Sequence, residues 1–512
     1  MTKVTIYDGA ATIGGNKVYI EEKNKGVFLD FGTNFAKYKV FYQEFLSDRS
    51  ARGIYDLVSL NLIPKLNIYR KDLIPSDLDL SSFPKLNIEA VLLSHAHLDH
   101  FGNIGLLDKK YPIIASPSTI MLLKAILDTS SARLGSDVAY YSEKSQYDKD
   151  YRILKTNRRE KRGDIGRNFI CTNKFSESFK EFLSTSTKKN REIEPGNLCT
   201  SDTISAPFEI KPYIVDHSIY GATAYILEGD TTIAYSGDFR LHGKKADKSR
   251  NFVEAAKNSS ILIIEGTRAS REEIEEESEE IVFNNCLDAV KNSKGLVIAD
   301  FSARNFERLE NFQTIAETVG RTLIITSKDA YLLRALEKAD GIDRTKKVLI
   351  YKELRAGSRN WEDFYFKKEV GEKKYIDPKK ISQSPDKFLL CFSLFDMKHL
   401  LDIKPVGGTY VYSSSEAFEE ESEYDFLRLT KWIETFGFKI YGYEIVEQEG
   451  RDKPEFVKGY HASGHVSQTD IRWAIETIDP DVIIPVHTDN PAWFTENFDN
   501  AILLNDGQSY EK

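Results

Sequence analysis

Apolar residues along this chain fall into short runs and longer periodic runs, a pattern typical of a mixed α/β protein. Short runs bounded by polar residues or glycine indicate strands, and apolar positions every three or four residues indicate helices. In the first half we predict strands at 3–7, 26–30, 89–94, 222–227, 231–236 and 261–264, with helices at 117–127 and 249–257.

The second half alternates more regularly. Helices are predicted near 271–291, 303–319, 328–338 and 421–436, and strands at 295–299, 322–326, 387–392 and 408–413. Strands that alternate with helices indicate a parallel sheet covered by helices. Residues 356–386 are polar and give no clear period. A helix near 467–478 and a strand at 481–486 return the chain to the first sheet system.

Composition fits a large globular protein. A chain of 512 residues predicts more than one domain. No stretch approaches about 18 consecutive apolar residues, and the start lacks a secretory apolar core, so no membrane partner is expected. The four cysteines are far apart and form no C-x-x-C pair, which favours reduced thiols in a cytoplasmic protein.

Residues 91–102 carry the strongest chemical signal, V-L-L-S-H-A-H-L-D-H-F-G. Three of the nine histidines fall in this segment, which argues against a chance cluster. Imidazole and carboxylate ligands suit Zn²⁺. In an extended segment His95, His97 and Asp99 share a face, whereas His100 points elsewhere unless the chain turns. Four ligands in one segment make a dinuclear site plausible.

The cluster resembles the signature of the metallo-β-lactamase superfamily. V-F-L-D-F-G at 27–32 and the glycine turn at 13–17 are similar to the early strands of that family. The resemblance then implies a later lone histidine, His217, and a bridging aspartate, Asp238, each at a predicted strand end. It also implies an αββα sandwich.

The gap between Asp238 and His487 is long enough to hold a whole domain. This arrangement resembles the β-CASP branch, in particular ribonuclease J and its archaeal relatives. The acidic, first histidine and second histidine motifs of that branch match Glu265, His465 and His487. The implied fold is α/β, with a metallo-β-lactamase domain at 1–265 and 455–512 and an inserted α/β β-CASP domain at 266–454.

By resemblance, the site contains two Zn²⁺ per chain, with Mn²⁺ or Mg²⁺ as alternatives. One ion would be held by His95, His97 and His217, the other by Asp99, His100 and His487, with Asp238 between them. The ions would lower the pKa of a shared water and supply a hydroxide that hydrolyses RNA phosphodiester bonds, by 5′-exonuclease or endonuclease action. The residues expected to be catalytic are Asp99, His465, which would donate a proton, and Glu265, which would orient a ligand histidine.

Substrate phosphate contacts are predicted at four positions. Ser463 and Gly464 form the turn that lies by a phosphate pocket in ribonuclease J-like enzymes, and His461 precedes them. Arg304 follows a predicted strand and opens a helix, where backbone amides and a guanidinium suit an anion.

Single-stranded RNA is the favoured partner, because a histidine at position 487 accompanies RNA substrates in this branch. A DNA nuclease and a non-catalytic RNA-binding scaffold remain alternatives. The third motif departs from the usual H-G-E, because Thr488 and Asp489 follow His487. The segment 101–212 is long for the family. Only 25 residues follow His487, too few for the C-terminal domain of bacterial ribonuclease J, so a homodimer is left open.

Charge is unevenly distributed around a net value of −9. The basic run at 152–167 fits an RNA-binding strip and a solvated insertion equally well. The acidic run at 271–280 is interpreted as an exposed helix start, with Ser270 and Glu273 as a capping box.

Overall fold

The computed structural model describes most of the chain. The described residues are 1–43, 45–130, 134–156, 163–200, 207–271, 278–357, 359–414, 420–448 and 450–512. The predicted capping-box residue Glu273 and residues 157–162 of the basic run lie outside them.

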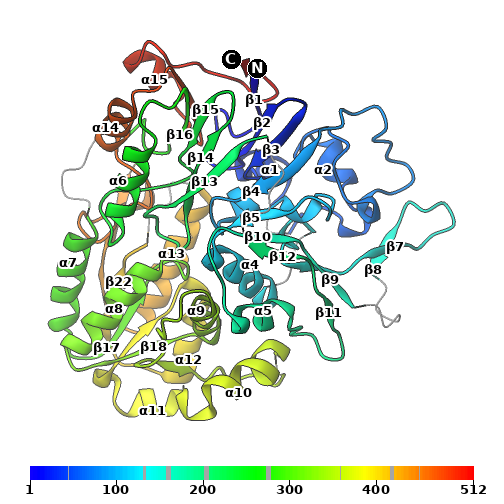
Figure 1. Cartoon of the computed structure of the whole chain (residues 1–512). Coiled ribbons are helices and arrows are strands. Elements are labelled where there is room, and N and C mark those ends of the chain that lie inside the picture. Colours follow the sequence, from blue (N-terminus) through cyan, green and yellow to red (C-terminus); the bar gives the residue numbers. More distant parts are fainter. Residues whose placement is uncertain are drawn as a thin grey trace.

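Two sheets form the first layer system (Figure 1). The larger one has the order β12 (Leu198–Thr200), β10 (Phe169–Cys171), β5 (Ile113–Ala115), β4 (Ile88–Leu92), β3 (Lys25–Leu29), β2 (Lys17–Glu22), β1 (Thr2–Asp8) and β27 (Ser509–Glu511). The smaller one has the order β13 (Glu209–Ile214), β14 (Thr223–Glu228), β15 (Thr232–Tyr235), β16 (Ile261–Glu265) and β26 (Val482–Val486). β16 pairs in parallel with β26, so the end of the chain completes the sheet begun before the insertion.

The two sheets pack face to face because their strands are apolar on the facing sides. Val27 and Leu92 of the larger sheet share one buried cluster with Tyr225 and Ile263 of the smaller sheet. On the outer faces, α4 (Pro117–Thr129) covers the larger sheet, and α6 (Ala246–Ala255) and α14 (Gln468–Ile478) cover the smaller one. The layers are therefore helix, sheet, sheet and helix, as predicted.

The inserted stretch builds a third sheet in which every strand pair is parallel. Its order is β20 (Tyr375–Ile376), β19 (Leu349–Tyr351), β18 (Thr322–Ile325), β21 (Phe388–Cys391), β17 (Leu296–Asp300), β22 (Gly408–Tyr412) and β23 (Phe438–Tyr441). Its main helices are α7 (Glu279–Lys291), α8 (Phe306–Thr318), α9 (Ser327–Asp340) and α13 (Glu420–Thr435). The parallel arrangement matches the predicted alternation. The domain boundaries at 265 and 455 stay a prediction.

Short elements account for most of what the apolar pattern did not predict. The stretch 356–386 contains a π-helix at Trp361–Phe366, α10 (Lys367–Val370) and α11 (Pro378–Gln383). Segment 101–212 adds β5, β10 and β12 to the larger sheet, three residues each. Three residues are too few to show a strand period.

The remaining elements are short helices and hairpins. They are α1 (Phe35–Phe41), α2 (Tyr55–Ser59), α3 (Leu98–Phe101), α5 (Glu177–Ser184), α12 (Leu400–Ile403), α15 (Ala492–Asn497), the pairs β7 (Lys144–Gln146) with β8 (Leu154–Thr156) and β24 (Tyr443–Gln448) with β25 (Arg451–Phe456), and the small sheet β11 (Ile193–Glu194), β9 (Asp164–Gly166) and β6 (Tyr140–Tyr141).

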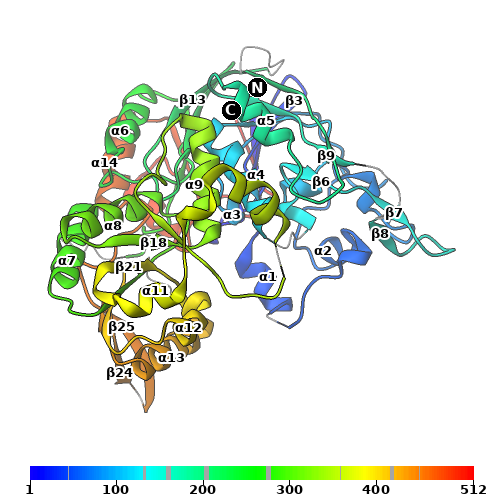
Figure 2. The same ribbon diagram turned by 90° about the horizontal axis from the view of Figure 1, so that it is seen from below.

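Side-chain contacts hold the inserted sheet against the sandwich. Figures 1 and 2 both show α9 beside α4, and the Tyr331 hydroxyl of α9 donates to buried Asp128 of α4 at 2.8 Å. Further along, the fully buried guanidinium of Arg240 pairs with Glu279 at 2.9 Å and with Glu307 at 2.6 Å. These contacts fix the side of the inserted sheet that faces the sandwich.

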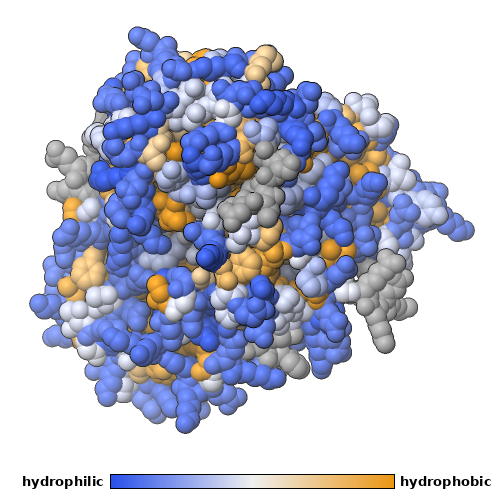
Figure 3. Space-filling view, in the orientation of Figure 1, coloured by the Kyte–Doolittle hydropathy of each residue, from blue (hydrophilic) through white to orange (hydrophobic). Residues whose placement is uncertain are grey.

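The described part of the chain contains no helix long and apolar enough to cross a membrane. The face shown in Figure 3 is largely hydrophilic, and hydrophobic residues appear there in scattered areas.

Candidate metal centre

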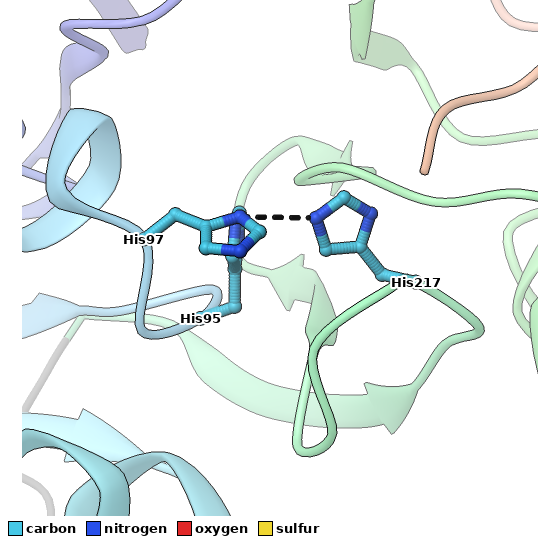
Figure 4. A group of neighbouring side chains, drawn as sticks. All are labelled: His95, His97 and His217. Carbon is cyan, nitrogen blue, oxygen red and sulfur yellow. Dashed lines mark hydrogen bonds between the residues drawn. The ribbon is translucent and has the colours of Figure 1, made fainter. Parts of the chain in front are cut away.

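Three histidines converge at the end of β4. His95 and His97 lie on the loop after this strand, and His217 lies on the loop between β13 and β14 (Figure 4). His95 Nε2 is 3.0 Å from His97 Nδ1, which is 3.2 Å from His217 Nε2. Tetrahedral Zn²⁺ with Zn–N bonds of about 2.0–2.1 Å separates its nitrogens by roughly 3.3 Å. The three rings are therefore arranged at nearly the spacing that one ion requires.

A second group lies next to the first. This second group consists of Asp99, His100 and His487. Asp99 and His100 lie on α3, which starts at Leu98. The chain therefore turns after His97, and Asp99 does not share a face with His95 and His97 as it would in an extended segment. Asp99 Oδ2 is 3.2 Å from His487 Nε2 and 3.7 Å from His100 Nε2.

Asp238 stands between the two groups. Its Oδ2 atom is 3.1 Å from His100 Nε2, 3.6 Å from His95 Nε2 and 3.8 Å from His487 Nε2. Among the described residues its Oδ1 atom is buried and accepts no hydrogen bond, and the buried His100 Nε2 also lacks one. Buried polar atoms without partners are costly, whereas metal coordination would use both. The donor set therefore fits two divalent ions that share one carboxylate.

The other nitrogen of His217 and of His487 is held by the chain. His217 Nδ1 donates to the Gly464 carbonyl at 2.6 Å, which leaves Nε2 directed at the first group. His487 Nδ1 is 2.9 Å from Thr267 Oγ1, and this hydroxyl donates to Glu265 at 2.7 Å. Glu265 is thus linked to His487 through Thr267, a residue that the sequence did not reveal, and its predicted orienting role stays a prediction.

Asp30 fixes His100. Its Oδ2 atom accepts from His100 Nδ1 at 2.7 Å and from the Tyr235 hydroxyl at 2.6 Å. Asp30 has a φ of +56°, and Ser94 also donates to its carboxylate. Asp30 lies in the segment V-F-L-D-F-G at 27–32, and the resemblance of this segment to the early strands of the superfamily gave it no role in the site. Metal-binding histidines commonly donate their other ring N–H to a carboxylate, which is the contact that Asp30 makes with His100.

Asp30→Asn is therefore expected to lower metal affinity roughly 10- to 100-fold, because the carboxylate that orients His100 is lost. Metal titration of the apoprotein would measure the change. Asp8→Asn is the matched control, since Asp8 is a buried carboxylate of the same sheet that pairs with Lys17 at 2.9 Å. Equal affinities in both variants would contradict the role of Asp30.

Backbone geometry brings the ligand loops unusually close. A Cβ atom on Gly32 would lie 1.6 Å from the Asp99 carbonyl oxygen, so only glycine fits there. His487 has a φ of +54°, an uncommon conformation for a non-glycine residue. Strained backbone of this kind concentrates at functional sites.

His465 forms a separate pair with Glu265. Its Nδ1 atom is 2.8 Å from Glu265 Oε2 and 3.8 Å from Asp238 Oδ2. Burial lowers the pKa of His465, but the carboxylates of Glu265 and Asp238 outweigh it and raise the pKa to about 9. Glu265 is itself held by the Phe239 N–H at 2.9 Å.

The first group consists of neutral imidazoles. Burial lowers the pKa of His97 to about 3 against the opposing charge of Asp99, and burial also holds the pKa values of His95 and His217 well below the ordinary value. Neutral imidazole is the form that binds metal ions.

The groups open onto a cavity of about 300 Å³ that His97, His217 and His465 line. Ser463 and Gly464 line it as well, and the Ser463 hydroxyl accepts from the His465 N–H at 3.1 Å.

The two other predicted phosphate contacts differ from these. His461 lines the cavity, but its ring nitrogens bond the carbonyls of Ser414 and Gly442 at 2.7 and 2.5 Å, so the chain holds its imidazole. Arg304 precedes α8 and lies close enough to lower the pKa of His97. His242 belongs to none of the ligand groups found among the described residues.

Comparison with known proteins finds a matching family model and several relatives. Residues 64–118, which include the H-x-H-x-D-H segment, match the family model described as metallo-beta-lactamase superfamily. This match agrees with the predicted resemblance to the metallo-β-lactamase superfamily. It is 23% identical to a ribonuclease J from Methanocaldococcus jannaschii over 85% of this chain and 83% of that protein. A ribonuclease J from Pyrococcus abyssi is 23% identical, over 95% of this chain and 90% of its own length.

Two further comparisons extend the likeness. A ribonuclease J from Sinorhizobium meliloti is 22% identical over 81% of this chain, which spans 60% of that longer protein. A crystal structure of a protein of unknown function from Enterococcus faecalis matches with a TM-score of 0.67 and 22% identity, covering 99% of both chains. The predicted resemblance and fold class are confirmed, and the match to the metallo-β-lactamase family model implies use of divalent metal.

Proposed function

We propose that this protein is a ribonuclease J-like enzyme of the metallo-β-lactamase superfamily and hydrolyses RNA phosphodiester bonds with two Zn²⁺ ions. The observation that carries the proposal is the meeting of two ligand groups at Asp238, next to a cavity lined by His465, which pairs with Glu265. The similarity to ribonuclease J from three organisms supports RNA as the substrate.

His95, His97 and His217 would hold one ion, and Asp99, His100 and His487 the other, with Asp238 shared. Bound there, the ions would polarise the phosphoryl oxygen and lower the pKa of a water at the site. The chain supplies the geometry. Asp30, Thr267 and the Gly464 carbonyl hold the ligand rings so that each presents one nitrogen to the centre.

His465 would donate a proton to the leaving oxygen, since Glu265 holds its Nδ1 and its ring lies on the cavity wall. The turn at Ser463 and Gly464 lies on the same wall and offers a hydroxyl and close backbone approach for a phosphate. Arg304 adds positive charge beside His97.

The first test uses metal-loaded protein with a 5′-labelled single-stranded RNA and its DNA counterpart. We expect RNA to be hydrolysed and the DNA to remain intact, and His97→Ala to be inactive because it loses a ligand. Release of labelled mononucleotide would indicate 5′-exonuclease action, and internal fragments endonuclease action. Degradation of DNA would support a DNA nuclease instead. Two bound ions without cleavage of either strand would support a non-catalytic RNA-binding scaffold.

A further inference from the structure

A second cavity lies at the carboxyl edge of the inserted sheet. Its volume is about 590 Å³, and its lining residues follow β17, β18, β19, β21 and β22. Open α/β sheets bind their ligands at this edge. Ser302 and Ser414 line both this cavity and the one that holds His97 and His465. The two cavities are therefore neighbours, and one extended ligand can occupy both.

Most carboxyl groups that line the second cavity already accept hydrogen bonds or form ion pairs within the protein. Asp329 and Asp396 each close a capping box at a helix start and accept hydrogen bonds there. Glu353 pairs with Arg359 at 2.9 Å. Asp300 is buried at the end of β17, where burial raises its pKa to about 7 and the Tyr410 hydroxyl donates to it at 2.5 Å. These carboxyl groups leave little free negative charge.

Lysine side chains supply positive charge to the second cavity. Lys328 and Lys398 line it, and within the described ranges neither forms an ion pair or side-chain hydrogen bond. Burial lowers the pKa of Lys328, and the charge of Arg304 lowers it further. Arg304 therefore lies near Lys328. It directly follows Ser302, which lines both cavities, and Ala303, which lines the second. Phosphates of a strand that enters both cavities would meet these cations.

Aromatic rings supply the rest of the wall. Phe395 is 82% exposed at this cavity and offers a free ring face, on which a base can stack. Tyr351 is only 2% exposed, and its hydroxyl has no hydrogen-bond partner among the described residues. A buried hydroxyl without a partner is costly unless a ligand satisfies it. The cavity thus combines a stacking face, a polar group inside and cations at its connection to the metal centre.

We propose that this second cavity binds one nucleotide of the substrate strand. The base would stack on Phe395 and bond the Tyr351 hydroxyl, and the phosphate would contact Lys328. This inference rests on the proposed ribonuclease activity. A free mononucleotide presents the same base and phosphate, so the experiment separates the two sources.

The test measures initial rates of the metal-loaded protein on an RNA decamer and on a dinucleotide. Phe395→Ala should raise KM for the decamer roughly tenfold, because stacking is lost. Phe395→Tyr keeps the ring face and should restore KM. Tyr351→Phe should raise KM roughly threefold to tenfold, because one hydrogen bond is lost without a change of shape.

Salt dependence isolates the phosphate contact. Lys328→Ala should reduce the slope of log KM against log salt concentration by about 0.7, the value for one phosphate of a single strand. Lys387→Ala is the matched control, an exposed lysine at the opposite end of β21. Its slope should equal that of the unaltered protein.

The outcomes are distinct. Larger KM values on the decamer with no change on the dinucleotide would support the strand subsite. If the decamer KM is unchanged but the Kd for a free nucleoside monophosphate rises, the cavity binds free nucleotide and the strand subsite is wrong. Unchanged values throughout, with RNA still cleaved, would overturn the subsite alone. If the unaltered protein cleaves no RNA, the proposed function fails first.

Discussion

Asp238→Asn is expected to reduce RNA hydrolysis by about a thousandfold or more. Metal ions contribute several kcal/mol to transition-state stabilisation, and each 1.36 kcal/mol is a factor of ten in rate. Asp238 Oδ2 faces His95 from one ligand group and His100 and His487 from the other, all within 3.8 Å. Loss of its charge should weaken both ion sites at once, so the bound metal should fall below two per chain.

Metal content by elemental analysis and initial rates on labelled RNA would be measured on the same preparations. Asp56→Asn is the matched control. Asp56 is a buried carboxylate on α2 that pairs with Arg49, and it belongs to none of the ligand groups among the described residues. This control should keep both ions and its rate. An Asp238→Asn protein with two ions and full rate would show that Asp238 does not bridge them.

The residues of the metal centre could be predicted because of where they lie along the chain. His95, Asp238 and His487 each follow a buried strand, and those strand ends meet at one edge of the sandwich. An apolar run followed by histidine or aspartate is visible in a single sequence. The sequence left open whether the segment stays extended or turns after His97; in the structure it turns, because α3 starts at Leu98 and directs Asp99 toward the second group.

Supporting residues were harder to predict. Thr267 acts on His487 from 220 positions away, and nothing in its spacing distinguishes it from other threonines. Arg240 is fully buried between two glutamates that follow it by 39 and 67 positions. A charged residue is ordinarily expected at the surface, so only the folded arrangement reveals these pairs.

The same limit applies to the second cavity. Its wall comes from the ends of five strands that are not in sequence order across the sheet. Phe395 and Lys328 therefore line the same cavity only in the folded chain. The sequence indicated the parallel sheet, and with it an edge where ligands bind. It did not indicate that this edge adjoins the metal centre through Ser302 and Ser414.

His465→Ala is expected to lower turnover about 10²- to 10⁴-fold while metal content stays near two ions per chain, as for loss of a general acid. His465 Nδ1 is held by Glu265 at 2.8 Å, so the ring is positioned by a carboxylate that does not belong to the His95 or His100 groups. His242→Gln is the matched control, because His242 lies outside every ligand group in the described chain, and both its turnover and its metal content should be unchanged.

The alternative is that His465 is itself a ligand, since its ring also lies within reach of Asp238 and His487. Two measurements separate the roles. Loss of an ion in His465→Ala would show that it is a ligand. If it donates the proton, the variant should recover most of its rate on a phosphodiester with a p-nitrophenolate leaving group, because that group departs without protonation. An equal loss on RNA and on the p-nitrophenyl ester, with both ions bound, would mean that His465 stabilises the phosphoryl group and does not protonate the leaving oxygen.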